Sequence, residues 1–380
     1  MSKKTILARG GAVAGSLAAL IFSTGAGEPQ AKADFGFVIT DLGVLFHKGE
    51  DSRDCPEGRS PSVLDAFLAA QSPAERSRLV RPENAQELER RYKTDYVFGP
   101  AGKDICTDAE AFDTPDRILQ KPTQSKIGPG LDLDAGQAGA SARVATCPHQ
   151  EFVSPTGEPG VDNQFYRAVA CNTAWRGRGE GFGDAVGELH WTEFPAVILV
   201  RGVESWRNDP EVEVVIAAST SRAPVDATRN IVDGGSLTMT ADPRYRSVVK
   251  GRIADGVLTT DPTNLVLPRH WVGASGGEFI LNHARIRARL TAEGALKGEA
   301  GGYRPIDNAI AFMRVGGPGV AETAGLECAS IRKTMRMLAD GDRNPKTGQC
   351  TSLSIGLSLA AKAAFVFDRG VLVGAPRGAM

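Results

Sequence analysis

The pentapeptide GASGG, residues 273–277, matches the G-x-S-x-G pattern in which many hydrolases present a nucleophilic serine, here Ser275. That chemistry requires a strand before the serine and a helix after it, so that the serine stands on the strained turn between them. The residues that follow, 279–291, mostly alternate apolar with polar side chains, which indicates a strand. We therefore interpret the pentapeptide as a glycine-rich turn, and Ser275 is the catalytic candidate only if the chain is a hydrolase.

A second pattern, Asp340, Asp342 and Asn344, places oxygen-bearing side chains at alternate positions of a short polar segment. Loops that turn around a calcium ion bind it in this way. The match to an EF-hand loop stops there, because Pro345 stands where glycine is needed and Thr351 where a bidentate glutamate is needed. We expect a turn after a helix, and Ca²⁺ is the only cofactor that the sequence suggests.

The densest group of polar and aromatic side chains follows residue 161. It contains Asp162, Asn163, Tyr166, Arg167 and Trp175. Rings beside amides and charges can bind a sugar or another ring-bearing ligand, since the rings stack and the polar groups fix the orientation. The other interpretation, which we favour, is a buried polar network that fixes how this segment packs on the rest of the protein.

Trp206 and the two glutamates that follow it complete the set of candidates. The segment 206–210, WRNDP, reads as a turn between two strands, and such loops often carry binding residues, which makes Trp206 a ligand-binding candidate. Glu211 and Glu213 have the i, i+2 spacing that puts two carboxylates on one face of a strand, as a glycosidase needs. They alternate with valines as solvent-facing residues do, so this carboxylate pair is a second way in which the chain could be a hydrolase.

Other chemistries lack their motifs in this sequence. The five histidines form no H-E-x-x-H pair, and neither a P-loop nor a dinucleotide-binding fingerprint is present. The formal net charge is −1, which gives no basic surface for nucleic acid. We expect no nucleotide cofactor and no nucleic-acid partner; a small molecule or a glycan is the partner that the candidate residues suggest.

The elements that must position these residues are mainly strands. Short β-branched and alternating runs fill residues 193–300 and are separated by turns rich in Asp, Gly and Pro. Helical spacing is found at 62–68, 85–96 and 322–339, and a last alternating run at 353–359 returns as a strand. Many short strands at even spacing predict a mainly β fold, an antiparallel β-sandwich of the jelly-roll or concanavalin A-like kind.

A resemblance supports this class of fold. The stretches ILVRGVESWRNDPEVEVVIAAS and ARIRARLTAEGALKGEAGG resemble the edges of sandwich domains in exported bacterial proteins, including concanavalin A-like ones. The stretch VDNQFYRAVACNTAWRG resembles a recurring segment of poorly characterised proteobacterial exported proteins. The resemblance covers residues 150–310; it implies a sandwich and export, and it brings no catalytic residues.

The even number of cysteines predicts disulfides. There are six, Cys55, Cys106, Cys147, Cys171, Cys328 and Cys350, and no C-x-x-C motif. Fifteen pairings are possible. We expect the sequential one, Cys55–Cys106, Cys147–Cys171 and Cys328–Cys350.

The first 33 residues have the layout of a secretory signal peptide. Three basic residues precede an uncharged run at 12–23, and Ala31-Lys32-Ala33 follows as a small-x-small cleavage site. The apolar run is too short to span a membrane, which takes about 20 residues, and no later stretch approaches that length. We therefore expect an exported protein, periplasmic or extracellular, without a transmembrane segment in the mature chain.

The predicted organisation has four parts: a signal peptide at 1–33, a loop-rich and partly helical region at 34–150, a β-sandwich at 151–315, and a helix with a returning strand at 316–380. The function expected for it is non-enzymatic binding of a carbohydrate, a lipid or another small ligand in the cell envelope or outside the cell. The alternatives are a secreted hydrolase that uses Ser275 or the carboxylate pair, and a structural envelope protein without a small ligand.

Overall fold

The computed structural model describes residues 32–94, 120–134, 146–172, 176, 194–228, 230–271, 274–315 and 328–376. Within these ranges it describes the backbone alone at 269–271, 274–276, 312–315 and 328. The predicted signal peptide, Cys106 and Trp175 lie outside the described residues, apart from the last two positions of the signal peptide, 32 and 33.

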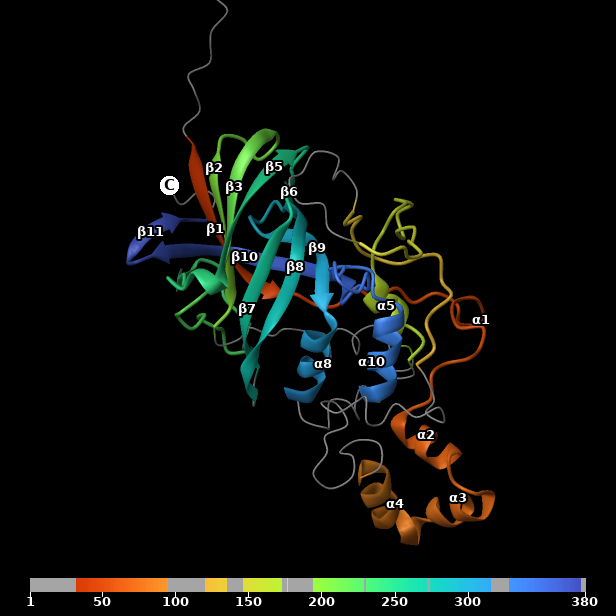
Figure 1. Ribbon diagram of the computed structural model, residues 1–380. Helices are drawn as coiled ribbons and strands as arrows, with labels where there is room; N and C mark the ends of the chain where they lie inside the picture. The colour runs from red at the N-terminus through yellow and green to blue at the C-terminus, as the bar shows by residue number, and fades with distance from the viewer. Residues whose placement is uncertain are drawn as a thin grey trace, which may run out of the picture. The chain divides into compact units, whose positions relative to one another are not determined.

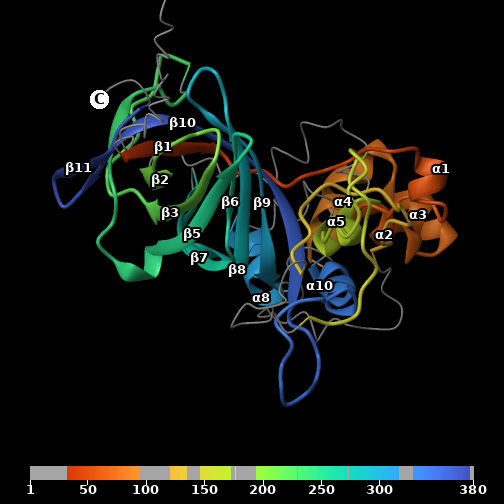
Figure 2. The same cartoon turned by 90° about the horizontal axis from the view of Figure 1, so that it is seen from above.

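Eight antiparallel strands form a closed β-barrel (Figures 1 and 2). The strands, in the order in which they pair, are β1 (Ala33–Asp41), β2 (Ala196–Val203), β3 (Asp209–Ala218), β5 (Arg246–Ala254), β6 (Val257–Thr260), β8 (Ala274–Leu290), β9 (Leu296–Pro305) and β10 (Ser352–Asp368). Strand β1 closes the barrel because it pairs with β2 along one edge and with β10 along the other. At Phe37 the two partners are Ile198 and Ala363.

The predicted β-sandwich is therefore wrong, although the prediction of a mainly β chain is correct. Alternation of apolar and polar residues shows only that each strand has one buried face, and it does so in a sandwich and in a barrel alike. The difference is made by the pairing of β1 with β10, whose partner residues Phe37 and Ala363 are more than 300 positions apart in the sequence. Local pattern carries no information about a pairing over that distance.

The barrel interior is filled by side chains from all eight strands, which belong to one buried apolar cluster. Phe37, Ile198, Val214, Ile286 and Leu357 are examples from five of them. Each of these side chains is no more than 6 % exposed. Burial of a side chain of this size contributes about 1.5–3 kcal/mol, so this cluster is the main source of the barrel's stability.

A second apolar cluster covers part of the outside of the barrel. Strand β4 (Gly235–Thr238) pairs with β10 in the parallel direction, and β11 (Val371–Gly374) pairs with β10 in the antiparallel direction. Leu237 of β4 packs there with outward-facing residues of β1, β2 and β10, among them Val38, Leu199 and Val366. These barrel strands are thus buried on both faces, which explains why they read as nearly continuous apolar runs.

The helices are short and lie outside the barrel. They are α1 (Asp51–Asp54), α2 (Val63–Ala69), α3 (Pro73–Leu79), α4 (Ala85–Tyr92), α5 (Gln164–Val169), α8 (Ile306–Val315) and α10 (Cys328–Met337). Helix α5 packs against β10, α8 packs against β8, and α10 contacts both α5 and α8.

The structure confirms helices near the predicted 62–68, 85–96 and 322–339, although the last two are shorter where they are described. Among the described residues, no helix combines the length and the apolar composition that crossing a membrane requires.

Two disulfides connect distant parts of the chain, Cys55 with Cys171 and Cys147 with Cys350. The predicted sequential pairing is wrong for these four cysteines, and Cys106 and the side chain of Cys328 lie outside the described residues. The bridges span 116 and 203 positions instead of the 20 to 50 expected. The longer loops make the bridges more stabilising, about 5 kcal/mol each from loop-closure entropy.

The barrel takes strands from several of the predicted parts. Strand β1 comes from the region 34–150 and β10 from the region 316–380, while the other barrel strands lie between them. The predicted boundaries at 150/151 and 315/316 stay a prediction. The barrel sheet contains strands from both sides of each boundary.

Candidate functional site

A buried cluster of ionisable side chains lies on the outer face of β9 and β10. Its members are Asp134, His149, Asp162, Tyr303 and Asp340. Tyr303 of β9 stands opposite Ser354 of β10 in the antiparallel register. The neighbouring side chains on these strands, such as Ile355, point into the barrel core, so the cluster faces away from the barrel interior.

His149 and Asp162 form the centre of the cluster. The imidazole Nε2 lies 2.6 Å from Asp162 Oδ1, and Nδ1 lies 3.0 Å from the carbonyl oxygen of Cys147. Because a carbonyl oxygen only accepts, Nδ1 carries a proton. The second carboxylate oxygen, Asp162 Oδ2, accepts a hydrogen bond of 2.7 Å from the backbone N–H of Leu133. The hydrogen bond to Asp162 raises the pKa of His149 to about 9, against the opposing effect of burial, so the ring is an imidazolium at neutral pH.

Asp340 and Tyr303 bring two unsatisfied polar atoms to the same cluster. Asp340 Oδ1 accepts a 2.7 Å hydrogen bond from the backbone N–H of Ser354, but Oδ2 has no hydrogen-bond partner among the described residues. The hydroxyl of Tyr303 is likewise buried without a partner there. Burial raises the pKa of Asp340 to about 6. Burial also raises the pKa of Tyr303, and the negative charges of Asp162, Asp340 and Asp134 raise it further.

Gly341 lets the chain pass close to this cluster. A Cβ atom at that position would lie 2.1 Å from Cδ1 of the Tyr303 ring, so only glycine fits between the ring and the backbone after Asp340. The chain then turns at Asp342, which has a φ of 53°. The close approach fixes Asp340 against β9 and β10.

The cluster is suited to holding a positive charge rather than to nucleophilic catalysis. Both nitrogens of His149 are engaged in hydrogen bonds, so the ring is not available as a general base. The ligand atoms of Asp134, His149 and Asp162 all lie within 4.8 Å of one another, which is compatible with a shared metal ion. These three are therefore the described residues that could hold a metal.

The described members of the predicted ligand-binding group, Asp162, Asn163, Tyr166 and Arg167, form a buried polar network in which each side chain has its own structural partner. Asn163 Oδ1 accepts from the backbone N–H of Tyr166, and its amide donates to the Pro129 carbonyl over 2.7 Å. The Tyr166 hydroxyl donates to the His47 carbonyl over 2.6 Å. The guanidinium of Arg167 lies 4.0 Å from the centre of the Phe152 ring and donates to backbone carbonyls. Only Asp162 belongs to the cluster around His149, and ligand binding by the others stays a prediction.

A buried ion pair completes this network next to the first disulfide. Arg176 and Asp54 are both fully buried, and their closest atoms, Nη2 and Oδ2, are 2.7 Å apart. Arg176 also pairs with Asp51 over 2.8 Å. The pair ties α1 to the segment after α5, close to the Cys55–Cys171 bridge. A buried charge that loses its partner is strongly destabilising, so this contact is structural.

The predicted calcium residues each have a different partner. Asp340 accepts from Ser354, whereas Asp342 Oδ2 accepts from the Asn282 amide over 2.7 Å and from the Ser352 hydroxyl over 2.5 Å. Asn344 Oδ1 accepts from the backbone N–H groups of its own turn. The structure thus brings Asp340 together with His149 rather than with Asp342 and Asn344. Calcium binding by the 340–344 segment stays a prediction.

Ser275 lies in a β-hairpin. Strand β7 (Thr263–Trp271) pairs with β8, and Ser275 stands opposite His270 in that register. Strand β8 continues to Leu290, so a strand follows the serine where a nucleophile elbow requires a helix. The side chain of Ser275 lies outside the described atoms, and its catalytic role stays a prediction.

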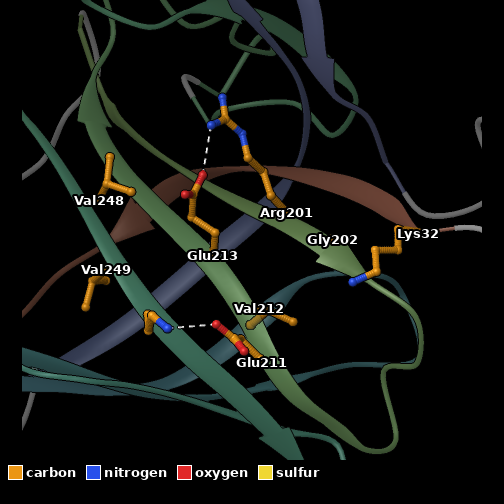
Figure 3. A pocket seen from close by; sticks show the side chains of 9 residues that line it. Lys32, Arg201, Gly202, Glu211, Val212, Glu213, Val248 and Val249 are labelled. Atoms are coloured by element: carbon orange, nitrogen blue, oxygen red, sulfur yellow. Dashed lines mark hydrogen bonds and ion pairs between the residues drawn. The ribbon is translucent and has the colours of Figure 1, made fainter.

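A hollow of about 460 Å³ opens on the outside of the barrel over β2, β3 and β5 (Figure 3). The residues that line it are Lys32, Arg201, Gly202, Glu211, Val212, Glu213, Val248, Val249 and Lys250. Four of its charges are paired within the hollow, Glu211 with Lys250 over 2.8 Å and Glu213 with Arg201 over 2.9 Å, whereas Lys32 pairs with Glu204 outside it. The two glutamates predicted as a carboxylate pair thus share this hollow, and Lys250 lowers the pKa of Glu211.

Trp206 lies apart from the residues that line the hollow. Its ring makes edge contacts with Phe35 and Phe37, at centroid distances of 5.3 and 6.1 Å. The indole N–H is buried without a partner in the described part of the chain. Trp206 thus packs against the apolar core from the loop between β2 and β3. Its role as a ligand-binding residue stays a prediction.

Sequence reasoning missed three members of the cluster: Asp134, His149 and Tyr303. They are isolated in the sequence, and each stands beside residues that suggest a turn or a strand. One signal was available for His149, which is two positions from Cys147. A disulfide cysteine fixes its neighbours in the fold, and a histidine so close to one is held in place with it.

Comparison with known proteins provides no relative from which a role could be transferred. The chain matches no protein-family model, no curated protein and no solved structure. The resemblance of residues 150–310 to exported proteobacterial proteins therefore stays a prediction. Any function has to be argued from the residues themselves.

Proposed function

We propose that this chain is an exported protein of the cell envelope or the surrounding medium that binds a small polar ligand, such as a carbohydrate, without catalysing a reaction. Two long-range disulfides support export, because such bonds persist in oxidising compartments outside the cytosol. The signal-peptide pattern of the first 33 residues supports the same location.

The observation that carries the proposal is the hollow over β2, β3 and β5. Its ion pairs are exposed at the surface, and exposed pairs of this kind contribute only about 0–1 kcal/mol. Each charged group can therefore leave its ion-pair partner and bind a hydroxyl or a charge of the ligand with little loss of free energy. Val248, which is 52 % exposed, adds an apolar surface beside them.

A polar ligand fits this hollow better than a lipid does. Five ionisable side chains surround it, Lys32, Arg201, Glu211, Glu213 and Lys250. An acyl chain needs an apolar channel, whereas the barrel interior is occupied by the side chains of the main core cluster. We therefore place the ligand on the outside of the barrel.

The electrostatics of the hollow argue against a glycosidase. A general acid of that class needs a carboxyl group with a raised pKa. In Glu211 the hydrogen bond from Lys250 lowers the pKa, so this carboxyl group is ionised at neutral pH and has no proton to donate. This favours binding over hydrolysis by the carboxylate pair.

The experiment is a ligand screen by saturation-transfer NMR on the oxidised protein, with a panel of monosaccharides, oligosaccharides and fatty acids. We expect a carbohydrate to bind and Arg201→Ala to weaken it at least tenfold. Arg252→Ala is the matched control, because Arg252 lies on β5 two residues from Lys250 and is not among the residues that line the hollow.

Two results would contradict the proposal. Binding of a fatty acid without binding of any sugar would exclude a polar ligand. Equal affinity in the Arg201→Ala and Arg252→Ala variants would show that the ligand does not bind in the hollow. Release of a reducing sugar from an oligosaccharide in the same samples would show catalysis and favour the hydrolase.

A further inference from the structure

We propose that the cluster on the outer face of β9 and β10 is a zinc site in which His149, Asp162 and Asp134 are ligands and the Tyr303 hydroxyl completes the coordination. This proposal is independent of the proposed function, because no residue of the cluster lines the hollow over β2, β3 and β5. It concerns residues that no sequence motif marked, apart from Asp162 and Asp340.

The spacing of the ligand atoms fits one ion. Ligands of a zinc ion lie about 2.0–2.2 Å from it, so two of them are about 3–4 Å apart. The atoms offered by Asp134, His149 and Asp162 all lie within 4.8 Å of one another. His149 Nε2 and Asp162 Oδ1 are 2.6 Å apart, held by a proton, and need to separate by less than about 1 Å to admit the metal in its place.

Both central ligands are already oriented by contacts of the kind that surrounds metal sites. His149 Nδ1 donates to the Cys147 carbonyl, which fixes the ring and directs Nε2 at the carboxylates. Metal-binding histidines almost always have such a bond at the other nitrogen. Asp162 Oδ2 is held by the backbone N–H of Leu133, which leaves Oδ1 toward the histidine.

The independent observation is the pair of unsatisfied atoms, Asp340 Oδ2 and the Tyr303 hydroxyl. Both residues are 0 % exposed, and a buried polar atom without a partner is destabilising. The charges of Asp162, Asp340 and Asp134 all act on Tyr303, and those of His149 and Asp162 act on Asp340. The two unsatisfied atoms are therefore near the three proposed ligands, although Asp340 lies outside the group of ligand atoms within 4.8 Å of one another.

The charges of the cluster also call for a cation. The carboxyl groups of Asp134, Asp162 and Asp340 act on Tyr303 together with the guanidinium of Arg285, and His149 acts on Asp340. Acidic side chains thus outnumber basic ones around this buried hydroxyl, and a bound cation compensates for that excess.

The donor types select zinc over calcium. Calcium takes oxygen ligands alone and needs six to eight of them, whereas zinc binds imidazole nitrogen and carboxylate oxygen together at low coordination number. One imidazole and two carboxylates make such a set. The absence of thiolates among the proposed ligands excludes the Cys-rich class of zinc site at this position.

The site would connect the irregular segments to the barrel. Asp134 ends the segment 120–134, His149 lies two residues from the Cys147–Cys350 bridge, and Tyr303 belongs to β9. One ion thus reinforces the attachment that the disulfide makes by covalent bonds. We assign it a structural role.

The test is isothermal titration of the full-length, metal-stripped, oxidised protein with ZnCl₂ and, separately, with CaCl₂. We expect one zinc per chain, and at least a tenfold loss of zinc affinity in Asp134→Asn and in His149→Gln. Asp134 is only partly buried, so its variant is the one expected to keep the fold, which circular dichroism checks. Asp132→Asn is the matched control in the same segment, with unchanged affinity expected.

Three results would overturn the assignment. Absence of zinc binding would mean that ordered water, not a metal, satisfies Tyr303 and Asp340. Zinc affinity that is the same in folded Asp134→Asn and His149→Gln as in the unaltered chain would place the metal elsewhere. Calcium bound more tightly than zinc, and lost in Asp342→Asn but not in His149→Gln, would move the site to the 340–344 segment.

Discussion

The barrel and the irregular segments that pack beside it are stabilised by different interactions. In the barrel, eight strands share one apolar cluster and a closed ladder of backbone hydrogen bonds. In the segments 42–60, 120–134 and 146–172 regular structure is sparse. Distant residues are joined there by two disulfides, by the Arg176–Asp54 pair and by buried side-chain hydrogen bonds to backbone carbonyls. A chain without regular structure must satisfy its buried backbone groups through side chains, and this explains the many buried polar residues there.

The largest effect that separates the two regions is expected from the disulfides. Replacing Cys147 and Cys350 by serine removes the bridge over 203 positions and about 5 kcal/mol of loop-closure entropy. Hydrogen exchange read by mass spectrometry is expected to rise at 127–134 and 146–163, with the amides of β2 and β3 still protected. Equal loss of protection in β2 and β3 would show that the regions unfold as one unit.

A somewhat smaller loss is expected from the buried ion pair. Asp54→Asn removes the buried counter-charge of Arg176 and leaves it paired with the partly exposed Asp51, which is expected to lower the free energy of unfolding by at most about 3–5 kcal/mol. Urea denaturation followed by circular dichroism measures this. Asp65→Asn, in an exposed helix cap, is a control for the loss of a carboxylate outside the buried pair. A change below that of the control would mean that Arg176 finds another partner.

In the barrel, a small cavity is expected to act on the whole sheet. Ile198→Val removes one methyl group from the interior, at a cost of about 0.5–1.5 kcal/mol. Because all eight strands share that cluster, the exchange of β1, β3 and β9 is expected to rise by the same factor. An increase confined to β2 would contradict the view of the barrel as one cooperative unit.

The smallest effect concerns pH and the exposed helices α3 and α4. Hydrogen bonds from Arg78 and then Arg91 lower the pKa of Glu75 from 4.5 to about 2. A carboxyl group whose pKa is lower in the folded state stabilises that state above its unfolded pKa, and the contribution disappears as the pH falls through about 2. Exchange of the α3 amides is expected to increase between pH 4.5 and 2, and Glu75→Gln removes that increase. The effect is modest because the ion pairs are exposed to solvent.

The sequence was informative where the determinants are local. The capping box at Ser62 and Asp65 marks the start of α2, and the alternation after Phe279 marks β8. Closure of the barrel depends on Phe37 meeting Ala363, and no local pattern encodes that pairing. The Cys147–Cys350 bridge and the approach of His149 to Asp340 depend on the same tertiary arrangement, so the sequence could not predict them either.

Closure of the barrel by β1 and β10 has a consequence for how the protein is made. During synthesis β1 emerges early and β10 only after more than 300 further residues, so the nascent chain has an open sheet without its last partner. Contacts of such long range slow folding, because the chain must lose much entropy before they form. This delay would suit the export proposed above, because a channel threads an extended polypeptide.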